Sequence, residues 1–347
     1  MSNFFDNKTI NARLKADANI LPFLTFPLTK SCNFRCVYCG TGGELSASRC
    51  ETQDFNKLKE KIIIAHRLGI RKFRLTGGEP FLYPHIKELL YFFNELGVYT
   101  LVNTNGSLVA KNKDLIENLE SNIVFAASLD SLKPEIFESI VNRENQYNNV
   151  IEGIKILSSC DKLLRINMVV SRLNYEEVWD IIEFCSNLKC NLKLLDVVSV
   201  PLPYGNRTDL HISFAELEEK LRGICDSKKI HQYSRSFGTP CFIYKYKNVD
   251  ITVKSTWNGS HYDMNGICKN CNYFPCHEGL YDVFSLPDER IVGCRWSEES
   301  VEKQGFSFEE QLKNIAKIFQ RADYYSRESN EAMPPYPKFV TDSLNKI

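Results

Sequence analysis

The chain has 347 residues, of which 43% are hydrophobic and 25% are charged, the composition of an ordinary folded protein. Lysine plus arginine and aspartate plus glutamate number 43 each, so nothing in the charge favours nucleic acid as a partner. The N-terminus lacks the apolar core of a signal peptide, and no apolar stretch reaches ~18 residues. We therefore expect a cytoplasmic protein without a membrane partner.

Between residues 21 and 225, short apolar runs alternate with amphipathic segments. The expected strands cover 23–28, 71–75, 98–103, 123–127, 163–170 and 192–198. Apolar residues recur at helical spacing between them, as at Ile86, Leu89 and Phe93. Six strand–helix units predict parallel strands with right-handed crossovers. The fold class we expect is α/β, a partial (β/α)6 TIM-like barrel, with a doubly wound sheet as the alternative.

The pattern changes after Pro201. One helix is expected near 214–224, followed by short strands at 242–246 and 249–253. Proline, glycine and cysteine are frequent in this region, which predicts a small, irregular cysteine-rich unit. The expected parts are an N-terminal extension (1–20), the barrel core (21–225), the cysteine-rich region (226–325) and a polar tail (326–347).

Three of the 13 cysteines lie within eight residues, directly after the first expected strand. Cys32, Cys36 and Cys39 have the spacing CxxxCxxC, in a loop where barrel enzymes place their chemistry. Three thiolates can bind three irons of a [4Fe–4S] cube, and the fourth iron then stays open, because a complete set has four cysteines. Structural zinc is the alternative, although such sites normally have four ligands in paired CxxC units.

With the aromatic Tyr38 before its third cysteine, this motif resembles the signature of the radical S-adenosylmethionine (SAM) superfamily. The resemblance implies that SAM binds the open iron of the [4Fe–4S] cluster. Reductive cleavage of SAM would then yield a 5′-deoxyadenosyl radical, which abstracts hydrogen from a substrate. The family's usual one-electron donor, flavodoxin or ferredoxin, is implied as a partner.

Further motifs follow the later strands. The turn Gly77-Gly78-Glu79-Pro80 resembles the family's GGEP motif, which contacts the amino group of SAM. Small polar residues at the later strand ends suit a ribose and a carboxylate, although turn and helix-cap chemistry is the alternative reading. Together with the resemblance, these motifs give the expected SAM contacts: Tyr38, Gly77, Gly78, Glu79, Thr104, Asn105, Ser128, Asn167 and Val198, the last of them at the adenine.

A second group of cysteines comprises Cys268, Cys271, Cys276 and the distant Cys294. Four thiolates could also close a zinc tetrahedron, so zinc is the alternative to a second iron–sulfur cluster. From Leu21 to Arg295 the chain resembles the MoaA-like branch of the radical SAM superfamily. That branch holds an auxiliary [4Fe–4S] cluster, which carries over to Cys268, Cys271 and Cys294. Cys276 is an additional candidate ligand that would close this cluster.

The chain differs from that branch at residues that are expected to bind GTP or to promote its rearrangement. Tyr273, Phe274 and Pro275 stand in place of an Arg-x-Arg segment, Thr25 stands where an arginine is expected, and Asn345-Lys346-Ile347 replaces a terminal Gly-Gly. We therefore do not expect GTP cyclisation. Arg74 and Arg165 are the candidate contacts for a small anionic substrate, such as one derived from a nucleotide or a sugar. Modification of a ribosomally made peptide, with a SPASM- or twitch-like auxiliary domain, is the alternative.

Overall fold

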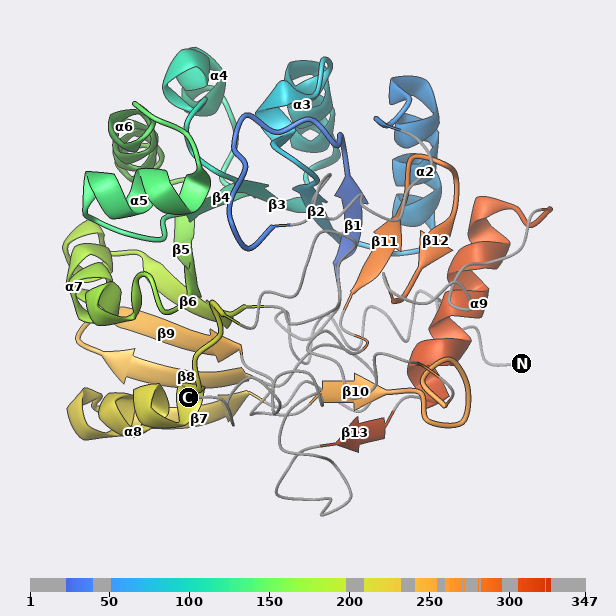
Figure 1. Ribbon diagram of the computed structural model, residues 1–347. Coiled ribbons are helices and arrows are strands. Elements are labelled where there is room, and N and C mark those ends of the chain that lie inside the picture. The colour runs from blue at the N-terminus through green and yellow to red at the C-terminus, as the bar shows by residue number, and fades with distance from the viewer. Residues whose placement is uncertain are drawn as a thin grey trace.

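The computed structural model describes residues 23–39, 51–197, 209–231, 241–254, 260–269, 271, 280, 282–294, 305–321 and 323–325. Its main feature is an eleven-stranded sheet with the strand order β12-β11-β1-β2-β3-β4-β5-β6-β9-β8-β7. The sheet curves around one interior, with helices on its outer side (Figure 1). This arrangement confirms the expected α/β class and the parallel, partial barrel.

Six consecutive strands run parallel, as the alternation of strands and helices predicted. They are β1 (Leu24–Pro27), β2 (Lys72–Thr76), β3 (Tyr99–Thr104), β4 (Ile123–Ser128), β5 (Leu163–Val170) and β6 (Asn191–Asp196). Since all six point the same way, their carboxyl ends meet at one edge of the sheet. The loops that follow them therefore lie together, although they are far apart in the sequence.

The outer helices are α2 (Phe55–Arg67), α3 (Ile86–Leu96), α4 (Lys113–Glu117), α5 (Pro134–Val141), α6 (Tyr147–Ser159) and α7 (Val178–Leu188). Their apolar stripes face the sheet, as in α3, where Ile86, Leu89 and Phe93 are buried. This helix ends at Gly97, whose φ of 63° is left-handed and favours glycine. Burial of these stripes leaves the opposite, inner face of the sheet free for polar side chains.

The segment after residue 225 extends the same sheet at both edges. After α8 (Phe214–Ile224), strands β7 (Ser227–His231), β8 (Cys241–Tyr246) and β9 (Val249–Lys254) follow β6, with β9 parallel to it. At the other edge, β11 (Val283–Ser285) pairs parallel to β1 and antiparallel to β12 (Ile291–Val292). The expected boundary at residue 225 therefore does not mark an end of the sheet, and the division into domains stays a prediction.

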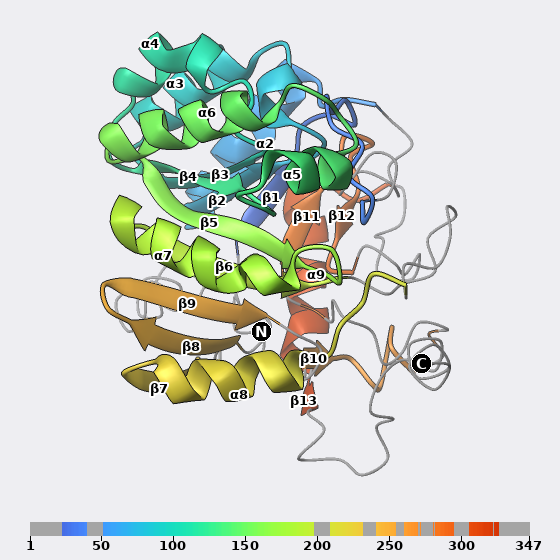
Figure 2. The same cartoon turned by 60° about the vertical axis from the view of Figure 1, so that its left-hand side comes forward.

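Three further elements belong to the C-terminal part. Strands β10 (Ser260–Tyr262) and β13 (Asp323–Tyr325) form a separate antiparallel pair, and α9 (Phe308–Arg321) packs beside β12 and α2. Figure 2 shows β10 and β13 apart from the main sheet, near one end of α8 in this view. None of the helices in the described part of the chain combines the length and apolar character that a membrane crossing requires.

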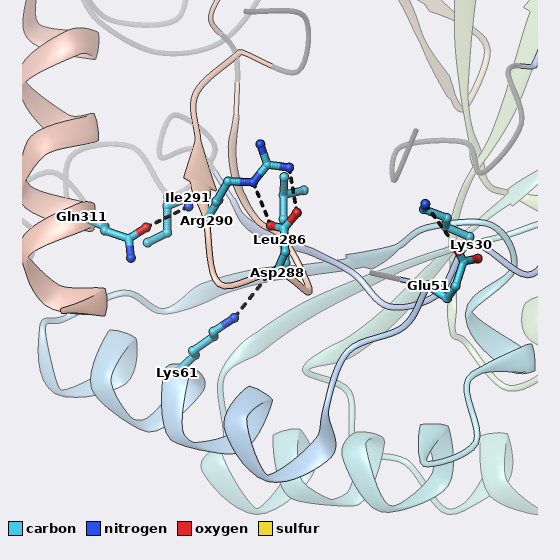
Figure 3. A network of polar contacts seen from close by, with 8 residues as sticks. All are labelled: Lys30, Glu51, Lys61, Leu286, Asp288, Arg290, Ile291 and Gln311. Carbon is cyan, nitrogen blue, oxygen red and sulfur yellow. Dashed lines mark hydrogen bonds and ion pairs between the residues drawn. The ribbon is translucent and has the colours of Figure 1, made fainter. Parts of the chain in front are cut away.

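Polar contacts hold the hairpin of β11 and β12 against the barrel (Figure 3). Lys61 on α2 donates to the carbonyl oxygen of Leu286 at 3.2 Å, and Gln311 on α9 accepts from the backbone of Ile291 at 3.0 Å. The buried Gln53 donates to the carbonyl oxygens of Pro27 and Ser285 at 3.2 and 2.8 Å. Because an unpaired buried polar group is costly, these bonds fix the hairpin against β1.

Burial lowers the pKa of Lys61 from 10.5 to about 8, which makes a pH-dependent contribution to stability. Between these two values the unfolded chain holds a proton that the native chain has lost, so this residue's contribution to the free energy of unfolding rises with pH. We expect Lys61→Met to be most favourable, relative to the parent, near pH 7.5 and less so at pH 9.5. Urea unfolding of both proteins at the two pH values measures this, and a pH-independent difference would contradict it.

Candidate active site

The first cysteine motif forms a loop at the carboxyl end of β1. Cys32 and Cys36 are half-buried, whereas Cys39 is exposed. Burial raises the pKa of Cys36, and the nearby Asp130 carboxylate and the thiols of Cys39 and Cys32 raise it further. Because their charges act on Cys36, the thiols of Cys32 and Cys39 lie near it, as the motif predicted.

The GGEP turn packs directly against this loop. The amide of Gly78 donates to the carbonyl oxygen of Thr29 at 2.6 Å, and the amide of Glu79 donates to that of Ser31 at 2.8 Å. A methyl group on Gly78 would lie 2.2 Å from the Ser31 oxygen, and Gly77 has a φ of 134°. The two glycines thus allow a close approach to the cysteine loop, and their contact with SAM stays a prediction.

Glu79 is fully buried behind the turn. Its carboxylate accepts hydrogen bonds from the Thr104 hydroxyl and the Asn105 amide, both at 2.7 Å, and from the Phe81 amide at 3.1 Å. Burial raises the pKa of Glu79 to about 7, and these three bonds oppose the rise. Three of the expected SAM-binding residues, Glu79, Thr104 and Asn105, are therefore joined to one another across β2 and β3.

A second network links the loop after β3 to the cysteine motif. The Asn105 amide group donates to the Asn33 side-chain oxygen at 2.9 Å, and Asn33 donates to the Ser107 hydroxyl at 2.8 Å. Asn105 in turn accepts from the Ser107 hydroxyl at 2.6 Å. Sequence reasoning missed Asn33 and Ser107, because only the tertiary structure brings the two loops together.

Tyr38 points back into the protein instead of toward solvent. Its hydroxyl donates to Asp130, which follows β4, at 2.6 Å, and the other carboxylate oxygen of Asp130 accepts from the Val169 amide at 2.8 Å. Burial raises the pKa of Asp130 to about 6 and that of Tyr38 well above its usual value. Asp130 does not cap the helix that follows it, since α5 begins after Lys133 and has no side-chain cap.

Ser128 and Asn167 lie opposite each other at the register of β4 and β5. Asn167 accepts from the side chain of Arg165 at 2.9 Å, which connects an expected SAM contact with an expected substrate contact. Val198, expected at the adenine, lies outside the described residues.

Arg74, the other expected substrate contact, is tied to the C-terminal segment. Its guanidinium forms an ion pair with the buried Asp282 and lies 4.4 Å from the ring centre of Phe23. Asp282 also accepts from the Thr25 hydroxyl at 2.8 Å. Arg74 therefore helps hold β11 against β1 and β2, and its contact with substrate stays a prediction.

The second group of cysteines also converges. Burial raises the pKa of Cys268 to about 12, and the thiols of Cys294 and Cys271 contribute to that rise. The amide of Cys268 donates to the carbonyl oxygen of Asp263 at 3.0 Å, which shapes the loop. Cys268 and Cys294, which are 26 positions apart in the sequence, are thus neighbours. Cys276 lies outside the described residues.

Thiols are the usual ligands of an iron–sulfur cube, so the chemistry of both cysteine groups suits such a cluster. Within the described residues, no three cysteine, histidine, aspartate or glutamate side chains are arranged to hold a single metal ion. A four-iron cube binds each thiolate at a separate iron, so its ligands stand farther apart than the ligands of one ion. Each group offers three thiols near one another, with burial and neighbouring negative charge that favour charge-neutralising ligation.

An open parallel barrel with three thiols in the loop after β1 is typical of barrel enzymes that hold a metal cofactor. Comparison with known proteins narrows this class. Residues 26–185 match the family model described as the Radical SAM superfamily. The chain is 33% identical over 223 residues to a probable GTP 3′,8-cyclase of Saccharolobus islandicus, covering 60% of this chain and 67% of that one. The chain belongs to the radical SAM superfamily, and it is an enzyme that uses SAM and a [4Fe–4S] cluster.

Other relatives point the same way. A probable GTP 3′,8-cyclase of Pyrococcus horikoshii is 29% identical over 249 residues, covering 70% of this chain and 77% of that one. Among solved structures, Streptococcus suis SuiB bound to S-adenosylmethionine matches with a TM-score of 0.61 at 17% identity, covering 89% of this chain and 68% of that one. At this level of identity, the second likeness shows the fold alone.

The packing of Gly78 against the cysteine loop generates a direct test. Gly78→Ala places a methyl group where the Ser31 oxygen lies, so the loop must move and the thiols separate. We expect iron bound after anaerobic reconstitution to fall by at least half, measured by a colorimetric iron assay. Gly223→Ala is the matched control, since no atom lies within 4 Å of the added methyl group. Equal iron content in the two variants would contradict the role of this contact.

Proposed function

We propose that the chain binds its SAM-cleaving [4Fe–4S] cluster through Cys32, Cys36 and Cys39 and abstracts hydrogen from a small substrate derived from a nucleotide or a sugar. The observation that carries this proposal is the contact between the cysteine loop and the GGEP turn, reinforced by Glu79, Thr104 and Asn105. When bound, the cluster and SAM together supply one-electron cleavage to a 5′-deoxyadenosyl radical. A flavodoxin or a ferredoxin is the expected electron donor.

The chain's own residues position the cofactor. Glu79 is fully buried and its carboxylate is held by three hydrogen bonds, so it fixes the GGEP turn that is proposed to contact the ammonium group of SAM. Ser128 and Asn167 face the interior in one row of the sheet and suit the hydroxyl groups of a ribose. Tyr38, held by Asp130, sets the position of the segment between Cys36 and Cys39.

We also propose an auxiliary iron–sulfur cluster on Cys268, Cys271 and Cys294. Its support is that the thiols of Cys294 and Cys271 both lie near enough to Cys268 to raise the pKa of Cys268. Three ligands would leave one iron open toward the substrate, whereas ligation by Cys276 would close the set.

The substrate is proposed to be a small molecule, because relatives over most of the barrel carry names of nucleotide enzymes. The chain lacks the Arg-x-Arg segment expected to grip GTP, since Tyr273, Phe274 and Pro275 occupy its place, and GTP cyclisation is therefore not proposed. Peptide modification is the second candidate function, and a solved structure of Streptococcus suis SuiB bound to a precursor peptide has the same fold with a TM-score of 0.58.

Formation of 5′-deoxyadenosine tests the central proposal. We expect the anaerobically reconstituted protein to convert SAM to 5′-deoxyadenosine when dithionite supplies electrons, as measured by liquid chromatography. Cys36→Ala removes one iron ligand and should lower this product to the level seen without dithionite. Cys160→Ala, which removes a half-buried thiol at the C-terminal end of α6, is the matched control and should behave as the parent. Absence of the product from the parent would refute the enzyme proposed.

Iron content tests the auxiliary cluster separately. We expect roughly eight irons per chain in the reconstituted parent and roughly four in Cys268→Ala, because one four-iron cluster is lost. Cys276→Ala should keep roughly eight if three thiols suffice. Zinc in place of iron at these cysteines, detected by mass spectrometry of metals, would refute the auxiliary cluster.

A further inference from the structure

Arg35, between the first two cysteines of the CxxxCxxC motif, turns back onto the loop that contains it. Its guanidinium nitrogen Nη1 donates to the carbonyl oxygens of Cys32 and Phe34 at 2.6 and 2.8 Å. A long, exposed side chain loses rotamer freedom when it is fixed in this way, and the two hydrogen bonds offset that loss. The positive charge is therefore held beside the backbone of a proposed iron ligand instead of extending into solvent.

The end of helix α5 fixes the backbone of Arg35 at the same place. The amide of Arg35 donates to the carbonyl oxygen of Val141 at 2.9 Å, and the amide of Val37 donates to that of Ile140 at the same distance. These oxygens belong to the last turn of α5, whose carbonyl groups have no partner within the helix. The carboxyl end of a helix carries a partial negative charge, so a cation is favourable there. Both the backbone and the side chain of Arg35 are thus held against the cysteine loop.

The charge of Arg35 acts on a thiol that also lies near carboxyl groups. Burial raises the pKa of Cys32, the Glu79 carboxylate adds to the rise, and Arg35 opposes it. Burial also raises the pKa of Cys36, and the Asp130 carboxylate adds to that rise. The carboxylates and the end of α5 disfavour further negative charge at this loop, whereas Arg35 favours it.

We propose that Arg35 raises the reduction potential of the N-terminal [4Fe–4S] cluster and thereby favours uptake of the electron that cleaves SAM. This inference rests on the proposed function, since it concerns the cluster on Cys32, Cys36 and Cys39. One electron passes from the flavodoxin or ferredoxin to the cluster, whose charge becomes one unit more negative, and no proton moves and no bond changes at Arg35. A fixed positive charge stabilises the more negative of two states, and net charge is one of the factors that set the potential of an iron–sulfur cluster.

A redox titration of the full, reconstituted chain, followed by electron paramagnetic resonance, tests this. The signal to follow is the one that changes when SAM is added, which separates it from the signal of an auxiliary cluster. Arg35→Met removes the charge and keeps most of the length of the side chain. We expect the equilibrium constant for one-electron reduction to fall about fivefold, which is ~40 mV toward more negative potential.

The matched control is Arg67→Met. Arg67 is exposed at the end of α2, where the chain enters β2, so it lies at the opposite edge of the sheet from the cysteine loop. This variant loses the same charge from the same type of side chain and should titrate as the parent.

Two further variants separate the charge of Arg35 from its hydrogen bonds. Arg35→Lys keeps the charge without the planar fork and should stay within about twofold of the parent. Arg35→Glu reverses the charge and should shift the potential about twice as far as Arg35→Met, by ~80 mV. Because Arg35 is exposed, the difference between the parent and Arg35→Met should shrink at about 1 M salt. A merely structural role predicts that Arg35→Lys shifts as far as Arg35→Met and that salt has no effect.

The failure of this inference is distinguishable from that of the proposed function. Absence of a SAM-sensitive signal from the reduced parent would refute the proposed cluster itself. Such a signal with the same potential in the parent and in Arg35→Met, or an equal shift in Arg35→Lys, would overturn the role of Arg35 alone. If Arg35→Met does not retain iron, Arg35→Gln takes its place, since it keeps a hydrogen-bond donor without the charge, and the same shift is expected.

Discussion

The close contact between the cysteine loop and the turn after β2 is the constraint on which the site depends. Gly78 and Glu79 donate their amides to Thr29 and Ser31, and no side chain fits at Gly78. This contact brings the thiols beside a buried carboxylate that is itself fixed by the end of β3. The proposed cofactor ligands and the groups proposed to orient the cofactor are thereby held by backbone contacts, which vary less than side-chain rotamers.

Parallel strand order makes this arrangement possible. Loops after β1, β2, β3 and β4 meet at one edge, and polar side chains connect each loop to another: Asn33 with Asn105, and Tyr38 with Asp130. Further polar side chains follow on the inner face of the sheet: Asn167 and Arg165 on β5, and Lys193 beside Asn167 on β6. One face of a single sheet therefore carries the proposed cofactor contacts and these basic side chains.

The C-terminal segment completes both ends of the curved sheet. Strand β9 brings Lys254 next to β6, while Asp282, directly before β11, pairs with Arg74 (Figure 1). The same segment holds the second group of thiols. The proposed auxiliary cluster and both ends of the curved sheet thus belong to one stretch of chain.

The sequence alone determined the six parallel strands, their helices and the two groups of cysteines, because hydrophobic periodicity and close cysteine spacing are local signals. The tertiary structure alone decided that Gly78 meets the cysteine loop, that Asp130 holds Tyr38, and that Arg74 is paired with Asp282. It also decided that residues beyond 225 join the core sheet and that Lys193 stands among cations. Arg74 and Asp282 are 208 positions apart, and no local pattern encodes which strands become neighbours.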